Sequence, residues 1–185
     1  MTKILFICHG NICRSVMAEM VMKELCRQAG VDNLFEIDSA AVSREEIGND
    51  IYPPAKRKLR EKGIPFSSHA ARQITRVDYD YYDYIICADR SNVRWLERII
   101  GEDTAHKVSL MMAWPQVQIT NHKNEVNRAL AAEKSPYGVS RSEEITNIGN
   151  VPDVSDPWYT GDFEAAYCDI DESCRAILKQ LTLNI

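Results

Sequence analysis

The residues of this sequence best suited to chemistry are Cys8 and Arg14, which have five residues between them. A cysteine thiolate is a strong nucleophile, and a guanidinium can hold two oxygens of a tetrahedral oxyanion at once. Five intervening residues are enough for a loop to wrap around a phosphate dianion. In such a loop the sulfur of Cys8 would lie beneath phosphorus, and the guanidinium of Arg14 would lie beside the phosphate oxygens.

The residues around Cys8 and Arg14 suit a loop whose backbone amides point at an anion. Gly10 permits a close backbone approach or a positive φ, and Asn11 tolerates a left-handed conformation better than most residues. A helix is expected to begin near Ser15, and its N-terminus would favour both a bound anion and the thiolate form of Cys8. We therefore predict a phosphate-binding loop that includes His9, Gly10, Asn11, Ile12, Cys13 and Ser15.

A structural explanation of the same segment is available. A lone cysteine more often packs as a small hydrophobic residue, and an arginine often lies on the surface of a helix. Cysteine and arginine at this spacing are a weak signal by themselves. Here an apolar strand, a glycine, an asparagine, a hydroxyl and a helix follow in the order that an anion site needs, and this favours the functional interpretation.

Asp156 is the candidate general acid. A phosphate monoester releases its alcohol more readily when a positioned acid protonates the leaving oxygen, typically about 10²- to 10⁴-fold faster. Asp153, Asp156 and Asp162 lie in the same region, but only Asp156 precedes a proline, whose fixed φ stiffens the chain. An ordinary Asp-Pro turn is common in loops, so the pairing with Cys8 is what favours a catalytic role.

The elements that must position these residues follow an alternating pattern. Apolar runs rich in β-branched or aromatic residues are expected strands at residues 3–8, 34–39, 84–88 and 106–110. Amphipathic segments between and after them are expected helices at residues 15–29, 54–62, 91–100 and 163–178. This order predicts an α/β fold with a doubly wound, four-stranded parallel sheet in a flavodoxin-like three-layer arrangement. Ligands of such sheets bind at the carboxyl ends of the strands, where Cys8 stands.

The length of 185 residues, 45% of them hydrophobic, predicts one domain spanning residues 1–185. Residues 114–150 have few apolar positions, a polar cluster at 135–138 and one expected helix near 125–133. We interpret this stretch as an inserted loop or excursion before the acid loop. A group of tyrosines leads into the third expected strand in an alternating pattern that is typical of strands. We therefore expect these side chains to pack rather than to be modified: Tyr79, Tyr81, Tyr82 and Tyr84.

The composition restricts the partners. A net charge of −5 argues against nonspecific nucleic-acid binding. No run reaches the roughly 18 to 20 apolar residues of a membrane helix, and the apolar start is interpreted as a strand rather than a signal. Six cysteines are then expected as buried or catalytic thiols in a cytoplasmic protein. No group of His, Cys, Asp or Glu residues has the spacing of metal ligands, so we predict chemistry without a metal or other cofactor. We also expect the protein to be a monomer or weak dimer.

Residues 8–15 resemble the signature loop of the low-molecular-weight protein tyrosine phosphatases. Further blocks are similar to that family in the family's order, at residues 38–41, 68–75, 84–92 and 156–159. The resemblance covers nearly all of residues 3–110 and 151–180. It implies hydrolysis of protein phosphotyrosine or small aryl phosphates through a phosphocysteine on Cys8, with Arg14 holding phosphate and Asp156 as acid and base. It also implies a network that braces the loop, formed by Asn11, Ser15, Ser39 and His69.

The walls of the expected pocket are less typical. Glu45 stands where the family often places an aromatic residue, so this wall is expected to be polar or acidic. Trp158 and Tyr159 offer aromatic walls for an aryl phosphate, although for Tyr159 a packing or surface role is equally compatible with the sequence. Cys13 is expected across the loop from Cys8, either as a reversible disulfide partner or as a packed thiol.

Two other functions remain compatible with the loop. A thiol-dependent arsenate reductase shares it but needs further cysteines, and although Cys87 lies in a suitable region, residues 88–92 supply no second thiol. An Asp-Pro acid would also have no purpose in that reaction. A noncatalytic phosphate-binding module would need neither the thiol of Cys8 nor the carboxyl of Asp156.

Overall fold

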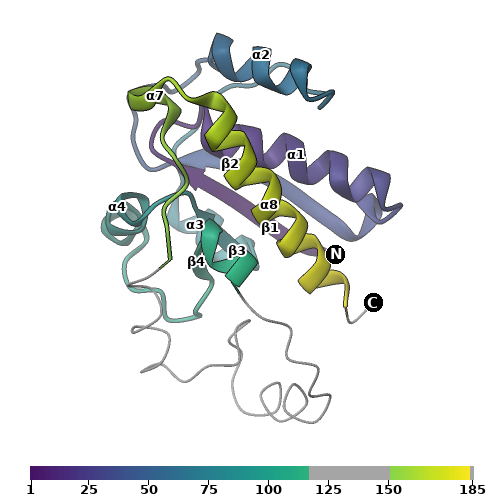
Figure 1. Cartoon of the computed structure of the whole chain (residues 1–185). Coiled ribbons are helices and arrows are strands. Elements are labelled where there is room, and N and C mark those ends of the chain that lie inside the picture. The colour runs from purple at the N-terminus through teal and green to yellow at the C-terminus, as the bar shows by residue number, and fades with distance from the viewer. Residues whose placement is uncertain (117–150, 184–185) are drawn as a thin grey trace.

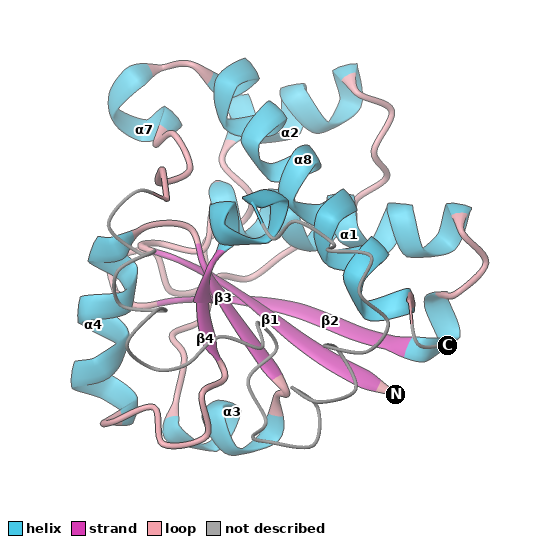
Figure 2. Ribbon diagram, turned by 60° about the horizontal axis from the view of Figure 1, so that its bottom comes forward, coloured by secondary structure: helices cyan, strands magenta, loops and turns pink. Residues whose placement is uncertain are grey.

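The computed structural model describes residues 1–116 and 151–183. One sheet of four parallel strands runs in the order β2-β1-β3-β4 (Figure 2). The strands lie close to the predicted positions and have the bounds β1 (Thr2–Cys8), β2 (Phe35–Ala41), β3 (Tyr84–Cys87) and β4 (Val108–Leu110). The prediction of a four-stranded parallel sheet is confirmed.

Helices cover both faces of this sheet (Figure 1). The predicted helices are present with small shifts at their ends, as α1 (Arg14–Gln28), α2 (Pro53–Glu61), α4 (Arg90–Ile100) and α8 (Phe163–Thr182). The sequence interpretation did not include the shorter helices α3 (Arg76–Tyr81) and α7 (Pro157–Thr160) or the 3-10 helices η1 (Asp32–Leu34) and η2 (Met111–Gln116). Helices α1 and α8 pack against each other on one face, and α3 and α4 lie on the other. The three-layer arrangement is therefore as predicted.

Strand β1 shows why the layers form. Ile4 and Phe6 belong to the core that β1 shares with α1 and α8, whereas Leu5 and Ile7 belong to the core shared with α3 and α4. All four side chains are fully buried. A parallel strand buried on both faces needs such a continuous apolar run, and the run ends at Cys8. The next residues leave the sheet at its carboxyl edge, where a loop can face a ligand.

The stretch around the tyrosines differs from the prediction. The tyrosine side chains were expected to alternate as in a strand, but Arg76–Tyr81 forms helix α3. The side chain of Thr75 accepts a hydrogen bond from the backbone of Asp78, and the Asp78 side chain accepts one from the backbone of Thr75. This capping box starts the helix, and its Thr-x-x-Asp signature was present in the sequence. Tyr79 and Tyr82 are buried as expected, while Tyr81 is 46% exposed.

Trp114 also differs from its predicted place at the start of an excursion. It lies in η2, is 1% exposed and packs edge-on against Tyr84 with ring centroids 5.8 Å apart. Gln180 of α8 donates a hydrogen bond to its backbone oxygen at 2.7 Å. The indole therefore belongs to the core between the sheet and α8. The rest of the predicted excursion, including the expected helix at 125–133, lies outside the described residues.

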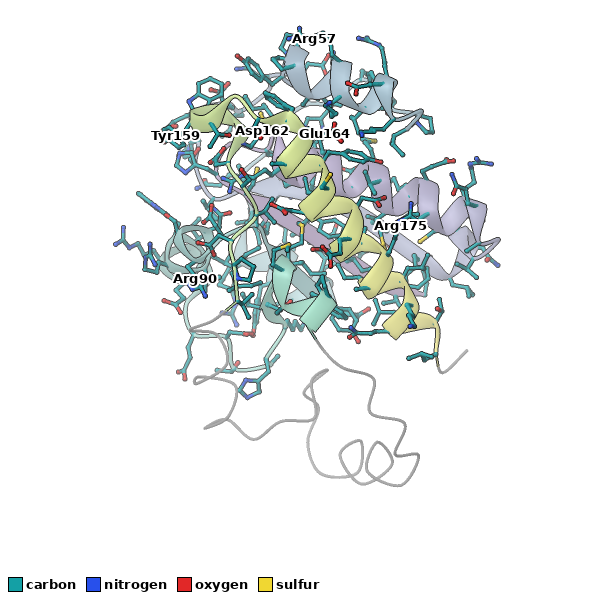
Figure 3. All side chains as sticks on the ribbon, in the orientation of Figure 1. Arg57, Arg90, Tyr159, Asp162, Glu164 and Arg175 are labelled. Carbon is teal, nitrogen blue, oxygen red and sulfur yellow. The ribbon has the colours of Figure 1, made fainter. Side chains whose placement is uncertain are left out.

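Ion pairs connect α2 to the start of α8, where Glu164 lies close to α2 (Figure 3). Its two carboxylate oxygens accept hydrogen bonds from Lys58 at 2.7 Å and from Lys62 at 2.5 Å. These two bonds lower the pKa of Glu164 to about 2. The contact holds α2 beside α8 directly after α7, the helix that carries the candidate acid loop. None of the described helices is long and apolar enough to cross a membrane.

Candidate active site

The loop between β1 and α1 places Cys8 at the carboxyl edge of the sheet, where its side chain is 3% exposed. Asn11 has a positive φ of 59°, which turns its backbone amide towards the thiol. That amide donates to Sγ of Cys8 at 3.3 Å, and the Ser15 hydroxyl lies 3.0 Å from the same sulfur. The sulfur therefore has two hydrogen-bonding neighbours from its own loop, of the kind that stabilise a thiolate.

A glycine is required at position 10 because another segment approaches its Cα closely, and not because of its own backbone angle. A Cβ at this position would lie 3.1 Å from Cγ of Glu46, which belongs to the loop after β2. This is closer than an ordinary van der Waals contact. The glycine thus allows the wall loop to close against the phosphate-binding loop.

Arg14 is the charged centre of the site and is 3% exposed. Its Nη1 donates to Asp89 at 2.7 Å, and its Nη2 donates to Asp156 at 2.6 Å. Burial alone would lower the pKa of this guanidinium, but the neighbouring Cys8, Asp156 and Asp89 raise it above its ordinary value. The predicted arginine and the predicted acid are therefore in direct contact, although 142 positions separate them in the chain.

The four residues expected to brace the loop meet around Asn11. Its side-chain amide donates to Ser15 at 3.0 Å and to Ser39 at 2.8 Å. Nε2 of His69 lies 2.8 Å from the backbone oxygen of Asn11, and the backbone amide of Arg72 donates to its side-chain oxygen at 3.1 Å. Asn11 thus has every side-chain group bonded, which holds its left-handed backbone in place.

Glu19 completes this network and was missed by the sequence interpretation. It lies on α1, is 5% exposed and accepts a hydrogen bond from the Ser39 hydroxyl at 2.6 Å. Lys23 pairs with its other oxygen at 2.5 Å. A carboxylate one helical turn after Ser15, on the same face as apolar residues, was the available signal. Such a buried charge requires partners of its own.

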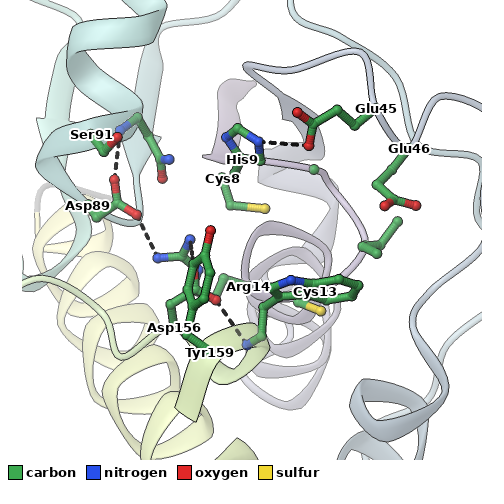
Figure 4. Close-up of a pocket in the computed structure, with 14 residues that line it drawn as sticks. Cys8, His9, Cys13, Arg14, Glu45, Glu46, Asp89, Ser91, Asp156 and Tyr159 are labelled. Carbon is green, nitrogen blue, oxygen red and sulfur yellow. Dashed lines mark hydrogen bonds and ion pairs between the residues drawn. The ribbon is translucent and has the colours of Figure 1, made fainter. Parts of the chain in front are cut away.

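The walls of the pocket come from two further segments (Figure 4). Glu45 and Glu46 form one wall, and Glu45 lies 3.1 Å from Nε2 of His9. Trp158 lies in the α7 segment and packs against Tyr52 with ring centroids 5.2 Å apart. Tyr159 also lines the pocket but is 85% exposed. The pocket therefore has an acidic wall and an aromatic wall.

The three candidate aspartates have different partners in the structure. Asp156 precedes α7 and caps it, because its Oδ1 accepts a hydrogen bond from the backbone of Trp158 at 3.1 Å. Asp153 instead pairs with Arg90 at 2.9 Å, and Asp162 caps α8. Only Asp156 of the three lines the pocket.

Cys13 lines the same pocket but has a different environment from Cys8. It is 6% exposed, and burial, followed by the charges of Cys8 and Asp156, raises the pKa of its thiol far above the ordinary value. All six cysteines are free thiols. The Cys13 thiol is therefore protonated at neutral pH and is a poor nucleophile.

We expect iodoacetamide at pH 7.5 to alkylate Cys8 before Cys13, because only the thiolate reacts. Inorganic phosphate should slow this labelling by covering the sulfur of Cys8. Peptide mass spectrometry after short exposure measures the ratio at the two positions. Preferential labelling of Cys13 would contradict the assignment of the nucleophile.

Two acidic or polar residues after β3 belong to the site and were not predicted. Asp89 binds Arg14 and also caps α4, and Asn92 follows in the first turn of that helix. Both line the pocket. Their position after β3 could have indicated this, because β3 pairs with β1 and the carboxyl ends of both strands lie at the same edge of the sheet. Among the described residues no group of three or more His, Cys, Asp or Glu side chains is placed to hold a metal ion.

Comparison with known proteins shows the family to which this chain is similar. A family model described as low molecular weight phosphotyrosine protein phosphatase matches residues 3–184. The low molecular weight protein-tyrosine-phosphatase YfkJ of Bacillus subtilis is 30% identical over 181 residues, covering 98% of this chain and 96% of that protein. The human low molecular weight phosphotyrosine protein phosphatase is 34% identical over 182 residues, covering 96% of this chain and 94% of that protein.

Solved structures show the same likeness. The crystal structure of YfkJ has a TM-score of 0.77 at 29% identity, covering 100% of this chain and 96% of that one. The crystal structure of DARP, a Drosophila arginine phosphatase, has a TM-score of 0.73 at 25% identity and covers 100% of both chains. The fold and most of the chain length are therefore shared with phosphatases.

Proposed function

The chain belongs to the low-molecular-weight phosphotyrosine protein phosphatase family, and we propose that it hydrolyses protein phosphotyrosine or small aryl phosphates through a phosphocysteine on Cys8. The observation that carries this proposal is the contact of Arg14 with Asp156 beside Cys8. A nucleophile, a phosphate ligand and an acid thus line one pocket. These three groups are what a two-step phosphate hydrolysis needs.

In the first step the thiolate of Cys8 attacks phosphorus, so that a sulfur–phosphorus bond forms and the bond to the leaving oxygen breaks. The loop amides and Arg14 hold the three equatorial oxygens and stabilise their charge. Asp156 donates its proton to the leaving oxygen, which departs as a neutral phenol or alcohol.

In the second step water attacks the phosphocysteine and Asp156, now a carboxylate, accepts a proton from it. The sulfur–phosphorus bond breaks and its electron pair returns to Cys8. The Ser15 hydroxyl at 3.0 Å and the amide of Asn11 at 3.3 Å support the thiolate as leaving group. The bracing network around Asn11 keeps both donors aimed at the sulfur through the two steps.

Hydrolysis is favoured over arsenate reduction by the burial of the other thiols near Cys8. Cys13 lines the pocket, but burial raises the pKa of its thiol far above the ordinary value. Reduction of arsenate needs a second thiol that can reach the adduct on the nucleophile. Cys87 is fully buried beneath the sheet edge, and burial raises the pKa of its thiol far above the ordinary value. Asp156 in the pocket has a purpose in hydrolysis and none in thiol exchange.

The assay that tests the proposal measures phosphate release from a phosphotyrosine peptide, phenyl phosphate, an alkyl phosphate and phosphoarginine. We expect the two aryl substrates to be the best, because Trp158 packed on Tyr52 offers an aromatic face at the pocket. Phosphoarginine is the comparison suggested by the structural likeness to an arginine phosphatase. No release from any aryl phosphate would refute the proposed function.

Glu45 should set the strength of the aryl preference. Replacement of Glu45 by tryptophan places an aromatic ring opposite Trp158 and removes a negative charge from the mouth of a site for dianions. We expect kcat/KM for phenyl phosphate to rise about fivefold, the effect of roughly 1 kcal/mol from one aromatic contact. The ratio of kcat/KM values for phenyl and ethyl phosphate measures this. An equal change for both substrates would show that charge alone acts at this position.

We further propose, from composition, that the protein acts in the cytoplasm as a monomer or weak dimer without a cofactor. The free thiols support the first part, because reduced cysteines are usual in that compartment.

A further inference from the structure

The side chain of Asn92 is the unexplained group of this site. Asn92 is 1% exposed, yet it lines the same pocket as Cys8. Among the described residues, its side-chain oxygen is the one buried side-chain oxygen or nitrogen atom without a hydrogen-bond partner. Only its backbone amide is bonded, to Asp89 at 2.6 Å. Asp89 and Ser91, which precede Asn92 at the start of α4, lie across the pocket from Glu45 and Glu46 (Figure 4).

An unpaired buried carboxamide is unfavourable unless something else bonds it. Buried polar groups in native proteins are almost always paired, and exceptions in pockets often have a functional partner. Because neither end of this carboxamide is held by a protein group, it can turn about χ2 without breaking a hydrogen bond. Asn92 can therefore present its oxygen to a molecule in the pocket.

We propose that Asn92 positions the water that hydrolyses the phosphocysteine, an inference that rests on the proposed function. The attacking water has two O–H groups, and Asp156 accepts the proton of one. The other O–H needs an acceptor if the water is to be held with its lone pair aimed at phosphorus.

The carboxylates of Asp89, Glu45 and Glu46, which also line the pocket, already have protein partners. One oxygen of Asp89 accepts from Arg14, and the other accepts from the backbone of Asn92. On the opposite wall Glu45 pairs with His9, and Glu46 accepts from the side chain of Asn49 at 2.6 Å. Among the described residues, the oxygen of Asn92 is therefore the buried acceptor on the α4 wall that no protein group bonds.

The water oxygen forms a bond to phosphorus, the bond from phosphorus to Sγ of Cys8 breaks, and the electron pair returns to the sulfur. One proton passes to Asp156. The second O–H stays on the product phosphate and is hydrogen-bonded to Asn92 until the product leaves.

This role distinguishes water from an alcohol as the acceptor of the phosphoryl group. Methanol has a single O–H group, which it must give to Asp156, so it gains nothing from a second acceptor. Asn92 should accelerate transfer to water and leave transfer to methanol unaffected. A purely structural residue would change both transfers alike.

The experiment uses phenyl phosphate with methanol in the buffer and measures the ratio of methyl phosphate to inorganic phosphate. We expect Asn92→Leu, which is nearly isosteric, to raise this ratio about tenfold, as for one hydrogen bond lost in the transition state. It should lower kcat while kcat/KM stays within about twofold, because kcat/KM reports phosphorylation of Cys8, before water acts. Asn92→Asp keeps an acceptor at both ends, so its ratio should stay near that of the unaltered protein.

Ser173→Ala is the matched control, since it removes a buried polar group of α8 that lies outside the pocket. Its product ratio should not change. If Asn92→Leu does not fold, Asn92→Ala tests the same expectation. An unchanged ratio in the folded variant would overturn the role of Asn92 alone. Absence of phenol release from the unaltered protein would overturn the proposed function and this inference together.

Discussion

Replacement of Cys8 by serine is expected to lower kcat for phenyl phosphate by at least about 10⁴-fold, the scale of loss seen when a nucleophile is removed from an enzyme. The serine hydroxyl fits the same space but is a much weaker nucleophile, because it is not ionised near neutral pH. Within residues 1–116 and 151–183, the groups hydrogen-bonded to Sγ are the Ser15 hydroxyl and the amide of Asn11, neither of which is a base. Serine therefore cannot be activated in this loop.

The same variant should still bind phosphate, because Arg14 and the loop amides remain in place. Competition by inorganic phosphate for a fluorescent ligand of the pocket measures this binding. Cys168→Ser is the matched control, because Cys168 is exposed on α8, and it should keep full activity. Substantial phosphatase activity in the Cys8 variant, or loss of activity in the Cys168 variant, would refute the assignment of the nucleophile.

Replacement of Asp156 by asparagine is expected to reduce turnover by about 10²- to 10⁴-fold for substrates with poor leaving groups. Asparagine fits the same space but has no proton to give to the departing oxygen. The loss should be smaller for 4-nitrophenyl phosphate, whose leaving group needs little protonation. Arg14 should remain free to bind phosphate, because the substitution removes the charge of one of its two carboxylate partners.

The dependence of kcat/KM on the pKa of the leaving phenol measures the role of Asp156 directly. The slope of that plot should become steeper in the Asp156→Asn variant. Asp153→Asn is the control, because Asp153 pairs with Arg90 and does not line the pocket. Equal losses for good and poor leaving groups would show that Asp156 supports the structure of the loop instead of donating a proton.

Most of the fold was predictable because its elements have local signals. Strand β1 has a continuous apolar run that ends at Cys8, and α1 is a 15-residue segment whose apolar residues are buried. The errors came where local signals compete. The tyrosines of α3 alternate like a strand, but the capping box at Thr75 decides for a helix. Trp114 looks like the first residue of a polar stretch, but its indole fills the space between Tyr84 and α8.

The candidate site was predictable where its residues are contiguous. Cys8, Asn11 and Arg14 lie in one loop, so their spacing alone indicates an anion site. Asp89 and Asn92 carried no such pattern, because an aspartate and an asparagine at a helix start are usual capping residues. Glu19 looked like an ordinary helix residue, and only its burial beside Ser39 shows its part in the network.

The sequence by itself determined the chemistry of this protein, because a thiol, a flexible turn and a guanidinium within one short loop can meet without the help of distant residues. Tertiary structure decided which carboxylates join them. Arg14 contacts Asp89 and Asp156 from 75 and 142 positions away, and Asp153 turns to Arg90 instead. Such contacts depend on how parallel strands bring their carboxyl ends to one edge. The free carboxamide of Asn92 could be recognised only there, since a missing partner is a property of the packed site.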